Sequence, residues 1–363
     1  MGASSGGAAL PVLTPVATAQ PPNRLKQADL RAIAEGVLPD RPGKADILSV
    51  FDNARIDERC LAMPVEWYLE RHGHKERAAV YQQVGLDLVQ QAAEGAMAAA
   101  GVAEDEVDGL VLVSTTGIAT PSLDARVMNR LPLRKDLVRL PVWGLGCAGG
   151  VGGVNRAADL ARADPDGLYL LVCMELCSLL FDIDKALQPG AAGPDKKSLV
   201  AASLFADGAA ATLLAGDATG LAGLRHVAGQ SHLFPDSERV MGWDVQDHNL
   251  EVVLSPKIPD IVRAEAGRLV SAFAGHHGAG QVVLHPGGAK VVEAFQDALA
   301  LPADALAPTR EALRKFGNLS SPTVLYALRE ALAMGRLPAG SGERAVLGAL
   351  GPGFASELAV VEA

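Results

Sequence analysis

Residues 142–155 read VWGLGCAGGVGGVN, and this stretch decides the fold. The apolar run over residues 137–143 predicts a strand, and the glycines after it open a helix over residues 148–163. Cys147 therefore stands at a strand-to-helix turn. The positive end of the helix dipole favours a thiolate there, and the neighbouring glycines leave backbone N–H groups open to an oxyanion. These features make Cys147 a candidate nucleophile that accepts an acyl group.

The same stretch has two further interpretations. Cys147 can be a buried cysteine in a glycine-rich turn where a helix packs on a sheet. The spacing of Gly144, Gly146 and Gly149 also matches G-x-G-x-x-G, the fingerprint of dinucleotide-binding proteins, and an aspartate follows the first glycine by 20 residues. However, this residue, Asp164, stands in a turn before a strand, whereas a ribose-binding acid should end one. The position of the motif deep in the chain also argues against a dinucleotide site.

Outward from this turn, short apolar strands alternate with helices. The expected strands cover residues 11–19, 109–114, 137–143, 167–174, 209–215, 281–284 and 344–351. The expected helices cover residues 27–35, 76–100, 148–163, 258–274, 289–299 and 321–333. This alternation predicts an α/β fold with two similar halves whose sheets are covered by helices. We expect a disordered leader at residues 1–13, an N-terminal half at 14–225 and a C-terminal half at 226–363, with an exposed loop at 188–197.

The composition excludes several classes of protein. Hydrophobic residues make up 49% of the 363, and 42 acidic against 32 basic residues give a net charge of −10. An acidic chain argues against a general nucleic-acid-binding protein, which needs a basic face. The sequence lacks the run of about 18 apolar residues that a membrane span needs. Four cysteines are too few for a disulfide scaffold, so we expect a reduced, cytoplasmic protein.

Two further segments place polar side chains at turns. His285 ends the apolar strand in VVLHPGGAKVV, residues 282–292, and the Pro-Gly-Gly after it leaves room beside the ring. Such a histidine is often structural, but it can also serve as a base, an acid or a hydrogen-bond donor. Asn318 precedes a helix in FGNLSSP, residues 316–322. It can belong to a capping segment, or it can supply an uncharged amide donor to a developing enolate.

The order Cys147, His285 and Asn318 fits the condensation of acyl and malonyl groups. A thiolate holds the growing acyl chain, and neutral donors stabilise the enolate that forms when a malonyl group loses CO2. A carboxylate in place of Asn318 would repel this enolate, whereas an amide donates to it. The three segments together therefore predict a condensing enzyme.

Four segments carry a resemblance to a known family. They are G-C-A-G-G at Cys147, H-P-G-G at His285, G-N-L-S-S at Asn318, and GPGFASE at residues 351–357. They resemble the signature segments of type III polyketide synthases, the chalcone synthase-like family, and weaker similarity reaches back to Ala17. This resemblance implies a thiolase-like fold, a homodimer, and an acyltransferase that uses acyl-CoA and malonyl-CoA without a metal or a cofactor. It also implies that the cysteine is the nucleophile and that the histidine and asparagine form the decarboxylation and oxyanion site.

The resemblance extends to residues around the substrates. Phe205 falls where the family has a gatekeeper aromatic between the coenzyme A tunnel and the reaction cavity, and an aliphatic residue near Val252 replaces a second one. Arg59 resembles a basic residue that contacts coenzyme A phosphates, although Asp57 and Glu58 stand where relatives have basic neighbours. The remaining residues expected to bind substrate are Lys290, Gly287, Gly288, Thr115, Cys177, Leu180 and Ala201.

The segments at residues 114–127 and 174–181 resemble bacterial members that make alkylpyrones or alkylresorcinols from fatty acyl starters. We therefore expect repeated malonyl extension of a medium or long acyl chain, followed by closure to a pyrone or resorcinol ring. Cys177 also resembles a cavity cysteine of naphthalene-forming members, which are primed by malonyl-CoA. The same polar residues are compatible with a 3-oxoacyl-carrier-protein synthase, which condenses once, with a Cys-His-Asn hydrolase, and with a scaffold subunit that has no activity.

Overall fold

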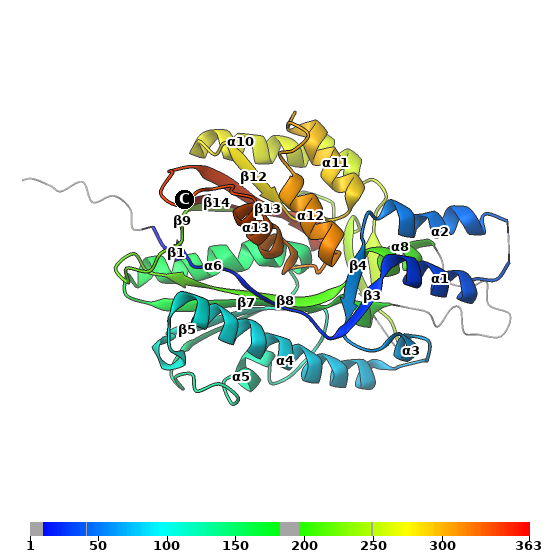
Figure 1. Ribbon diagram of the computed structural model, residues 1–363, viewed down its shortest axis with the longest axis horizontal. Coiled ribbons are helices and arrows are strands. Elements are labelled where there is room, and N and C mark those ends of the chain that lie inside the picture. Colours follow the sequence, from blue (N-terminus) through cyan, green and yellow to red (C-terminus); the bar gives the residue numbers. More distant parts are fainter. Residues whose placement is uncertain (1–9, 41, 182–195, 248–249) are drawn as a thin grey trace, which may run out of the picture.

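The computed structural model describes residues 10–40, 42–181, 196–247 and 250–363. Figure 1 shows how strands and helices alternate along the chain. The strands are β1 Val12–Leu13, β2 Ala17–Ala19, β3 Asn23–Lys26, β4 Glu58–Leu61, β5 Gly109–Val113, β6 Val138–Val142, β7 Leu168–Leu176, β8 Asp207–Ala215, β9 Leu224–Leu233, β10 Met241–Val245, β11 Leu250–Leu254, β12 Gln281–Leu284, β13 Arg344–Gly351 and β14 Ala355–Glu362.

The helices lie between these strands. They are α1 Gln27–Val37, α2 Lys44–Asn53, α3 Val65–Tyr68, α4 His74–Ala100, α5 Leu123–Val127, α6 Gly149–Ala163, α8 Lys196–Leu204, α9 Ile258–Ile261, α10 Gly267–His277, α11 Ala289–Ala298, α12 Ala307–Phe316 and α13 Thr323–Ala333. Short 3-10 turns are η1 Glu104–Glu106, η2 Gly146–Ala148, η3 Cys177–Leu180 and η5 Pro352–Phe354, and a π-helical turn, η4 Val262–Ala266, joins α9 to α10. None of the helices in the part of the chain that the structure describes is long and apolar enough to cross a membrane.

The alternation predicted from the sequence is confirmed, and the protein has an α/β fold. β12 and β13 have the predicted bounds, and the ends of β5, β6, β7, β8, α1, α4, α6 and α11 lie within two residues of them. The helix predicted over residues 258–274 contains the π-helical turn and continues to His277. Periodic apolar residues therefore located most elements of the sheet and its covering helices.

The prediction was wrong for one strand next to a proline. The strand expected over residues 11–19 is divided into β1 and β2 around Pro15, which has no N–H to donate to a sheet. The helix expected over residues 321–333 is α13, which begins two residues later, at Thr323, and ends as predicted.

Two predictions fall partly on residues that the structure does not describe. The expected leader at residues 1–13 overlaps β1 in its last two residues, and residues 1–9 lie outside the described part of the chain. Of the expected loop at residues 188–197, residues 188–195 also lie outside it, and the last two residues begin α8.

Ten strands form one mixed sheet in the order β12-β13-β14-β9-β1-β8-β7-β5-β6, with β2 also paired to β8. The pairs β12–β13, β5–β6 and β5–β7 are parallel, and the others are antiparallel. In the short strand β1, Val12 pairs with Ala215 of β8 on one side and with Arg225 of β9 on the other. The strands of the two halves are therefore joined through β1.

Helices form layers around this sheet (Figure 1). α4 packs on the outer face of β7 and β8, and α10 packs on the outer face of β13 and β14. α6 contacts β5 and β7 on one side and β13 and β14 on the other, and α13 lies beside it. These two helices are therefore enclosed between the two parts of the sheet. The hairpin of β3 and β4, with α1, α2 and α8, forms a separate layer at one end.

Glycines let α6 approach its neighbours closely. A Cβ atom at Gly150 would lie 2.2 Å from the carbonyl oxygen of Ser321 and 2.6 Å from a methyl carbon of Val324 in α13. A Cβ atom at Gly153 would lie 2.6 Å from a methyl carbon of Leu171 in β7. All three distances are shorter than non-bonded atoms tolerate, so α6 can lie this close to its neighbours only because glycines stand at these positions.

We predict that Gly150→Ala lowers the free energy of unfolding by about 1–3 kcal/mol, because the added methyl group overpacks the contact with the Ser321 carbonyl. Denaturant-induced unfolding followed by circular dichroism measures the change. Gly36→Ala is the matched control, since Gly36 is exposed in α1 and no atom lies within 4 Å of its added Cβ. This control should leave stability unchanged or raise it by up to about 1 kcal/mol. Equal stability changes in both variants would contradict the prediction.

Candidate active site

Cys147 lies in the turn η2, directly before α6, and its position is fixed by backbone geometry. Gly144 and Gly146 have positive φ values of 90° and 46°, which turn the chain from β6 into the helix. The N–H of Gly146 donates to the Thr115 hydroxyl oxygen at 3.0 Å. The Cys147 thiol lies 3.6 Å from the hydroxyl oxygen of Ser320. The nucleophile predicted from the sequence is thus held between the end of β5 and the loop before α13.

The thiol of Cys147 is in a buried environment. Burial raises its pKa to about 11, and hydrogen bonds with Ser320 and Asn318 oppose this rise. The thiolate expected from the helix dipole is therefore not the resting form, because loss of solvent outweighs the favourable groups. A base must take the proton when the thiol attacks a substrate.

Asn318 lies in the loop between α12 and α13, with its backbone tied to the segment after α8. Its N–H donates to the carbonyl oxygen of Leu204 at 2.9 Å, and its own carbonyl oxygen accepts from the N–H of Ala206 at 2.9 Å. Its side-chain oxygen accepts from the N–H of Ser320 at 2.8 Å. The amide NH2 group is therefore the part of the side chain left to interact with Cys147, whose pKa it lowers. This orientation presents a donor to the site.

His285 follows β12, as predicted, and its side chain is buried. Its N–H donates to the carbonyl oxygen of Gly348 in β13 at 2.8 Å. Neither ring nitrogen has a hydrogen-bond partner among the described residues. Burial lowers the pKa of the ring to about 3, so the imidazole is neutral near pH 7. An unpartnered neutral ring offers one donor and one acceptor to a ligand.

Strand β13 connects the histidine with the nucleophile. Gly348 holds the backbone of His285, and three residues later Gly351 lies against the nucleophile turn. A Cβ atom at Gly351 would lie 2.4 Å from the Leu145 carbonyl oxygen and 2.6 Å from the side chain of Ala148. The turns of Cys147 and Asn318 therefore lie side by side at the N-terminal end of α6, and β13 runs from the backbone of His285 to the Cys147 turn. The shared role of the three residues in catalysis stays a prediction. No described contact joins the His285 ring directly to the Cys147 sulfur.

Glu175 in β7 organises this end of the molecule and is not among the residues predicted from the sequence. One carboxylate oxygen accepts from the N–H groups of Thr115 and Thr116, both at 2.9 Å, and from the Thr116 hydroxyl at 2.8 Å. The other accepts from the Ser321 hydroxyl at 2.8 Å. Burial raises the pKa of Glu175 to about 7, and these four donors oppose the rise. An acid within an otherwise apolar strand was the signal for such a group.

The residues predicted to contact coenzyme A differ in how far they are exposed to solvent. Phe205 is half-buried and its backbone bridges to Asn318. Gly287 donates its N–H to the His285 carbonyl oxygen at 3.0 Å, and Gly288 has a φ of 149° that favours glycine. Lys290 is exposed in the first turn of α11. These positions leave their expected roles in substrate binding as predictions.

Arg59 requires a correction. Its side chain is 1% exposed, and its guanidinium donates to the carbonyl oxygen of Phe205 at 2.7 Å. It therefore does not reach the surface, where phosphates would bind, because β4 turns it toward the interior. The acidic neighbours Asp57 and Glu58 form ion pairs with Arg314 and Arg24, which compensate their charges.

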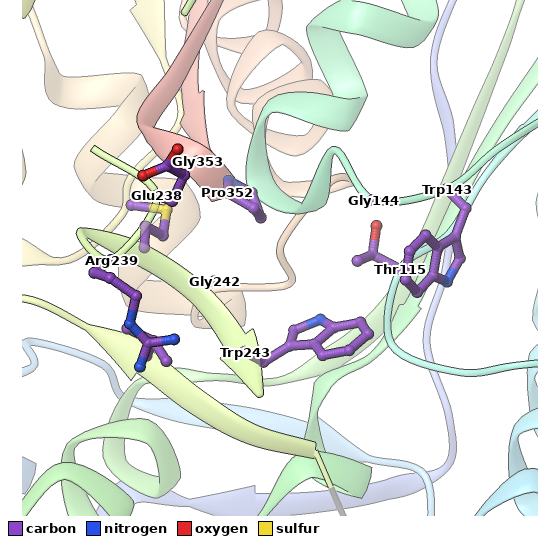
Figure 2. A pocket seen from close by; sticks show the side chains of 11 residues that line it. Thr115, Trp143, Gly144, Glu238, Arg239, Gly242, Trp243, Pro352 and Gly353 are labelled. Atoms are coloured by element: carbon purple, nitrogen blue, oxygen red, sulfur yellow. The ribbon is translucent and has the colours of Figure 1, made fainter. Parts of the chain in front are cut away.

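A cavity of about 240 Å³ adjoins the nucleophile turn (Figure 2). Thr115, predicted for the cavity, lines it with Trp143 and Gly144 on one side. Glu238 and Arg239 lie on the other side, with Trp243 between (Figure 2). The remaining lining residues are Met241, Gly242, Val253, Pro352 and Gly353.

Three residues predicted for the same cavity, or for its gate, lie elsewhere. Leu180, Ala201 and Val252 line a separate hollow of about 10 Å³ with Phe181, Lys197, Ser198 and Glu251. Cys177 is buried and lines neither space. It lies close enough to Cys147 for the two thiols to interact electrostatically, which contributes to a raised pKa of Cys177.

Comparison with known proteins decides the family. Residues 69–218 match the N-terminal domain of chalcone and stilbene synthases, and residues 225–363 match the C-terminal domain. The chain belongs to this family. A 1,3,6,8-tetrahydroxynaphthalene synthase of Streptomyces peucetius subsp. caesius is 38% identical to this polyketide synthase over 95% of the chain and 91% of its own length. A putative chalcone synthase of Bacillus subtilis (strain 168) is 36% identical over 86% of the chain and 87% of its own length.

A solved structure supports the same conclusion. The crystal structure of 1,3,6,8-tetrahydroxynaphthalene synthase from Streptomyces coelicolor A3(2), a bacterial type III polyketide synthase, matches with a TM-score of 0.89 and 27% identity. The match covers 97% of this chain and 99% of that one. The predicted family, the thiolase-like fold and the acyltransferase class are therefore confirmed, and the protein is a type III polyketide synthase.

We predict that Glu175→Gln lowers the stability of the protein only slightly, whereas Glu175→Leu lowers it strongly. In Glu175→Gln the amide oxygen can still accept from Thr115 and Thr116, and the amide NH2 can donate to a reoriented Ser321 hydroxyl. Glu175→Leu leaves all four donors without a partner, at a cost of about 1–3 kcal/mol for each buried group. Thermal unfolding should show a large loss for the leucine variant and a small one for the glutamine variant. A leucine variant as stable as the wild type would contradict this account.

Proposed function

We propose that this type III polyketide synthase is primed by malonyl-CoA and builds a hydroxylated naphthalene-type aromatic product. The observation that carries the proposal is the cavity beside Thr115, which Trp143 and Trp243 line together with the charged residues Glu238 and Arg239. The names of the tetrahydroxynaphthalene synthases that the chain resembles support it. Neither of these synthases supports the fatty acyl starter expected from the sequence, so that expectation stays a prediction.

The proposed reaction begins with transfer of the starter to Cys147. The sulfur forms a bond to the thioester carbon, the bond from that carbon to the coenzyme A sulfur breaks, and the thiol proton passes through His285 to the leaving thiolate. The neutral imidazole, with both ring nitrogens unpartnered among the described residues, suits this transfer. The positive end of α6 favours the transient cysteine thiolate.

Chain extension follows from the same residues. A bound malonyl-CoA loses CO2, and the electrons of the broken C–C bond pass to an enolate. The Asn318 amide and the His285 ring stabilise its oxygen by hydrogen bonds. The enolate carbon then attacks the thioester on Cys147, which leaves as a thiolate. In this proposal the coenzyme A thioesters are the substrates and no metal or cofactor takes part.

The cavity favours a polar chain over an alkyl chain. The rings of Trp143 and Trp243 pack edge to face, with centroids 5.3 Å apart, across the space beside Thr115. Glu238 and Arg239 line the opposite wall, which is therefore polar, and a two-pronged ion pair with Asp244, at 2.7 and 2.9 Å, holds Arg239 in place. Such walls suit a poly-β-keto chain with oxygen on alternate carbons, which can accept hydrogen bonds.

The hollow where we expected an alkyl tail is small. The hollow beside Leu180, Ala201 and Val252 measures about 10 Å³, roughly the room for one water molecule. A fatty acyl chain gains about 0.8 kcal/mol for each buried methylene, but only where the protein can enclose it. Within the described part of the chain, this region therefore gives little binding energy to a long starter.

We also propose the homodimer that the family resemblance implies. Among the described strands, β6 is at the edge of the sheet, and most of its residues are exposed or half-buried. Ile118, which follows β5, is 60% exposed although it is large and apolar. A strand at a sheet edge beside an exposed apolar side chain is suited to a second copy of the chain.

Two variants should separate loading from decarboxylation. Cys147→Ala should abolish transfer of an acyl group to the protein, because no other side chain supplies the thioester, while release of CO2 from malonyl-CoA continues. Asn318→Ala should keep loading and lose ~10²–10³ in the rate of CO2 release, the usual effect of removing one oxyanion donor. Intact-protein mass spectrometry measures loading, and labelled CO2 measures decarboxylation. Acylation of the Cys147→Ala protein would place the nucleophile elsewhere.

The starter is tested by giving the enzyme malonyl-CoA as its only thioester. We expect a hydroxylated aromatic product, identified by mass spectrometry, at a rate that hexanoyl-CoA or longer acyl-CoAs do not raise. Trp243→Ala should enlarge the cavity and raise kcat/KM for hexanoyl-CoA, whereas Val245→Ala, an exposed change on the same strand, should not. A requirement for a medium or long acyl-CoA, with activity rising with chain length, would overturn malonyl priming and favour an alkylpyrone product. It would leave the condensing mechanism intact.

A further inference from the structure

Arg59 is a charged side chain in the interior of the protein. It is 1% exposed, and burial lowers its pKa to about 9, a shift that the charge of Asp207 opposes. Its Nη1 donates to the Phe205 carbonyl oxygen at 2.7 Å, while Nε and Nη2 have no partner in the described part of the chain. A buried arginine with incomplete hydrogen bonding lowers the stability of the fold. An apolar residue at this position would be expected to give a more stable protein.

The aliphatic part of the same side chain lies against the residue before Asn318. A Cβ atom at Gly317 would lie 2.8 Å from Cδ and 3.0 Å from Cγ of Arg59. Gly317 has a φ of 72° and a ψ of −167°, a conformation that favours glycine. The arginine stem therefore occupies the space where a side chain at position 317 would lie, and it limits the movement of that backbone.

The segment that Arg59 contacts is paired with the loop of Asn318. The backbone of Asn318 is hydrogen-bonded to Leu204 and to Ala206, the two neighbours of Phe205. Arg59 holds the carbonyl of Phe205 between them. One buried side chain thus touches both segments of this bridge. β4, which carries it, is also tied to α12, because the N–H of Asp57 donates to the Arg314 carbonyl oxygen at 2.8 Å.

We propose that Arg59 is a positioning residue, which sets the place of the Asn318 amide relative to Cys147 by holding the bridge between Phe205 and Asn318. This inference rests on the proposed role of Asn318 in decarboxylation. It assigns to Arg59 an action on the reaction centre from within the core, in place of a contact with coenzyme A. Displacement of a catalytic group by about 1 Å can lower a rate by ~10²-fold, so a small shift of the loop is enough.

The first measurement compares two half reactions in Arg59→Met, which keeps a long stem and removes the guanidinium. We expect the rate of CO2 release from malonyl-CoA to fall by ~10- to 10²-fold, while acyl loading of Cys147 stays close to the wild type. Arg59→Lys should recover part of the loss, since an ammonium can still donate to the Phe205 carbonyl. Arg24→Met is the matched control, because Arg24 is exposed on the paired strand β3 and bonded to Glu58. It should leave both rates unchanged.

A double-mutant cycle with Asn318→Ala tests the route of the effect. If Arg59 acts through the amide, Arg59→Met should not lower CO2 release further in the Asn318→Ala background. An equal fall in both backgrounds, or an equal fall in loading and CO2 release, would show a general structural role and overturn the proposal. Normal CO2 release by Asn318→Ala alone would overturn the role of Asn318 itself. If Arg59→Met does not fold, Arg59→Lys is combined with Asn318→Ala in the same cycle. An equal fall in CO2 release in both backgrounds would overturn the proposal there too.

Discussion

The contact between α6 and the start of α13 is the constraint on which the active site depends. The backbone of Gly150 lies so close to the Ser321 carbonyl oxygen that no side chain fits between them. This approach puts the turn of Cys147, at the beginning of α6, beside the loop of Asn318, at the beginning of α13. Each helix is enclosed by the sheet, so neither can move away without exposing core residues. Close packing of backbones therefore sets the distance between nucleophile and amide.

Around this contact, some polar groups have all their hydrogen bonds and others have few or none. The groups that hold the site are saturated: Glu175 accepts four donors, and the Asn318 backbone is paired on both sides. The His285 ring, by contrast, has no partner among the described residues, and the Cys147 thiol interacts only weakly with the Ser320 hydroxyl, at 3.6 Å, and with the Asn318 amide. Leaving these groups unsatisfied costs stability, but it keeps their donors and acceptors free for a substrate. The saturated surroundings keep the unsaturated groups in place.

The sequence could predict features that depend on local patterns but not those that depend on contacts between distant segments. Cys147, His285 and Asn318 stand in glycine-marked turns between periodic elements, so their places in the fold could be inferred from local patterns, while their catalytic roles stay predictions. The burial of Arg59 could not, because β4 belongs to a short hairpin whose two faces have no clear apolar alternation. The function of Glu175 depends on donors from residues 115, 116 and 321, which only the folded chain brings together.

The predicted catalytic residues and the walls of the cavity come from different parts of the chain. The catalytic groups come from turns that the sheet and its enclosed helices hold rigidly. The walls of the cavity come instead from the end of β6, the hairpin of β10 and β11, and the turn η5. Trp243 belongs to that hairpin, which among the described strands pairs only with itself and not with the ten-stranded sheet. Under the proposed function, substitutions in this hairpin are therefore the ones expected to change the size and polarity of the cavity, and with them the choice of starter.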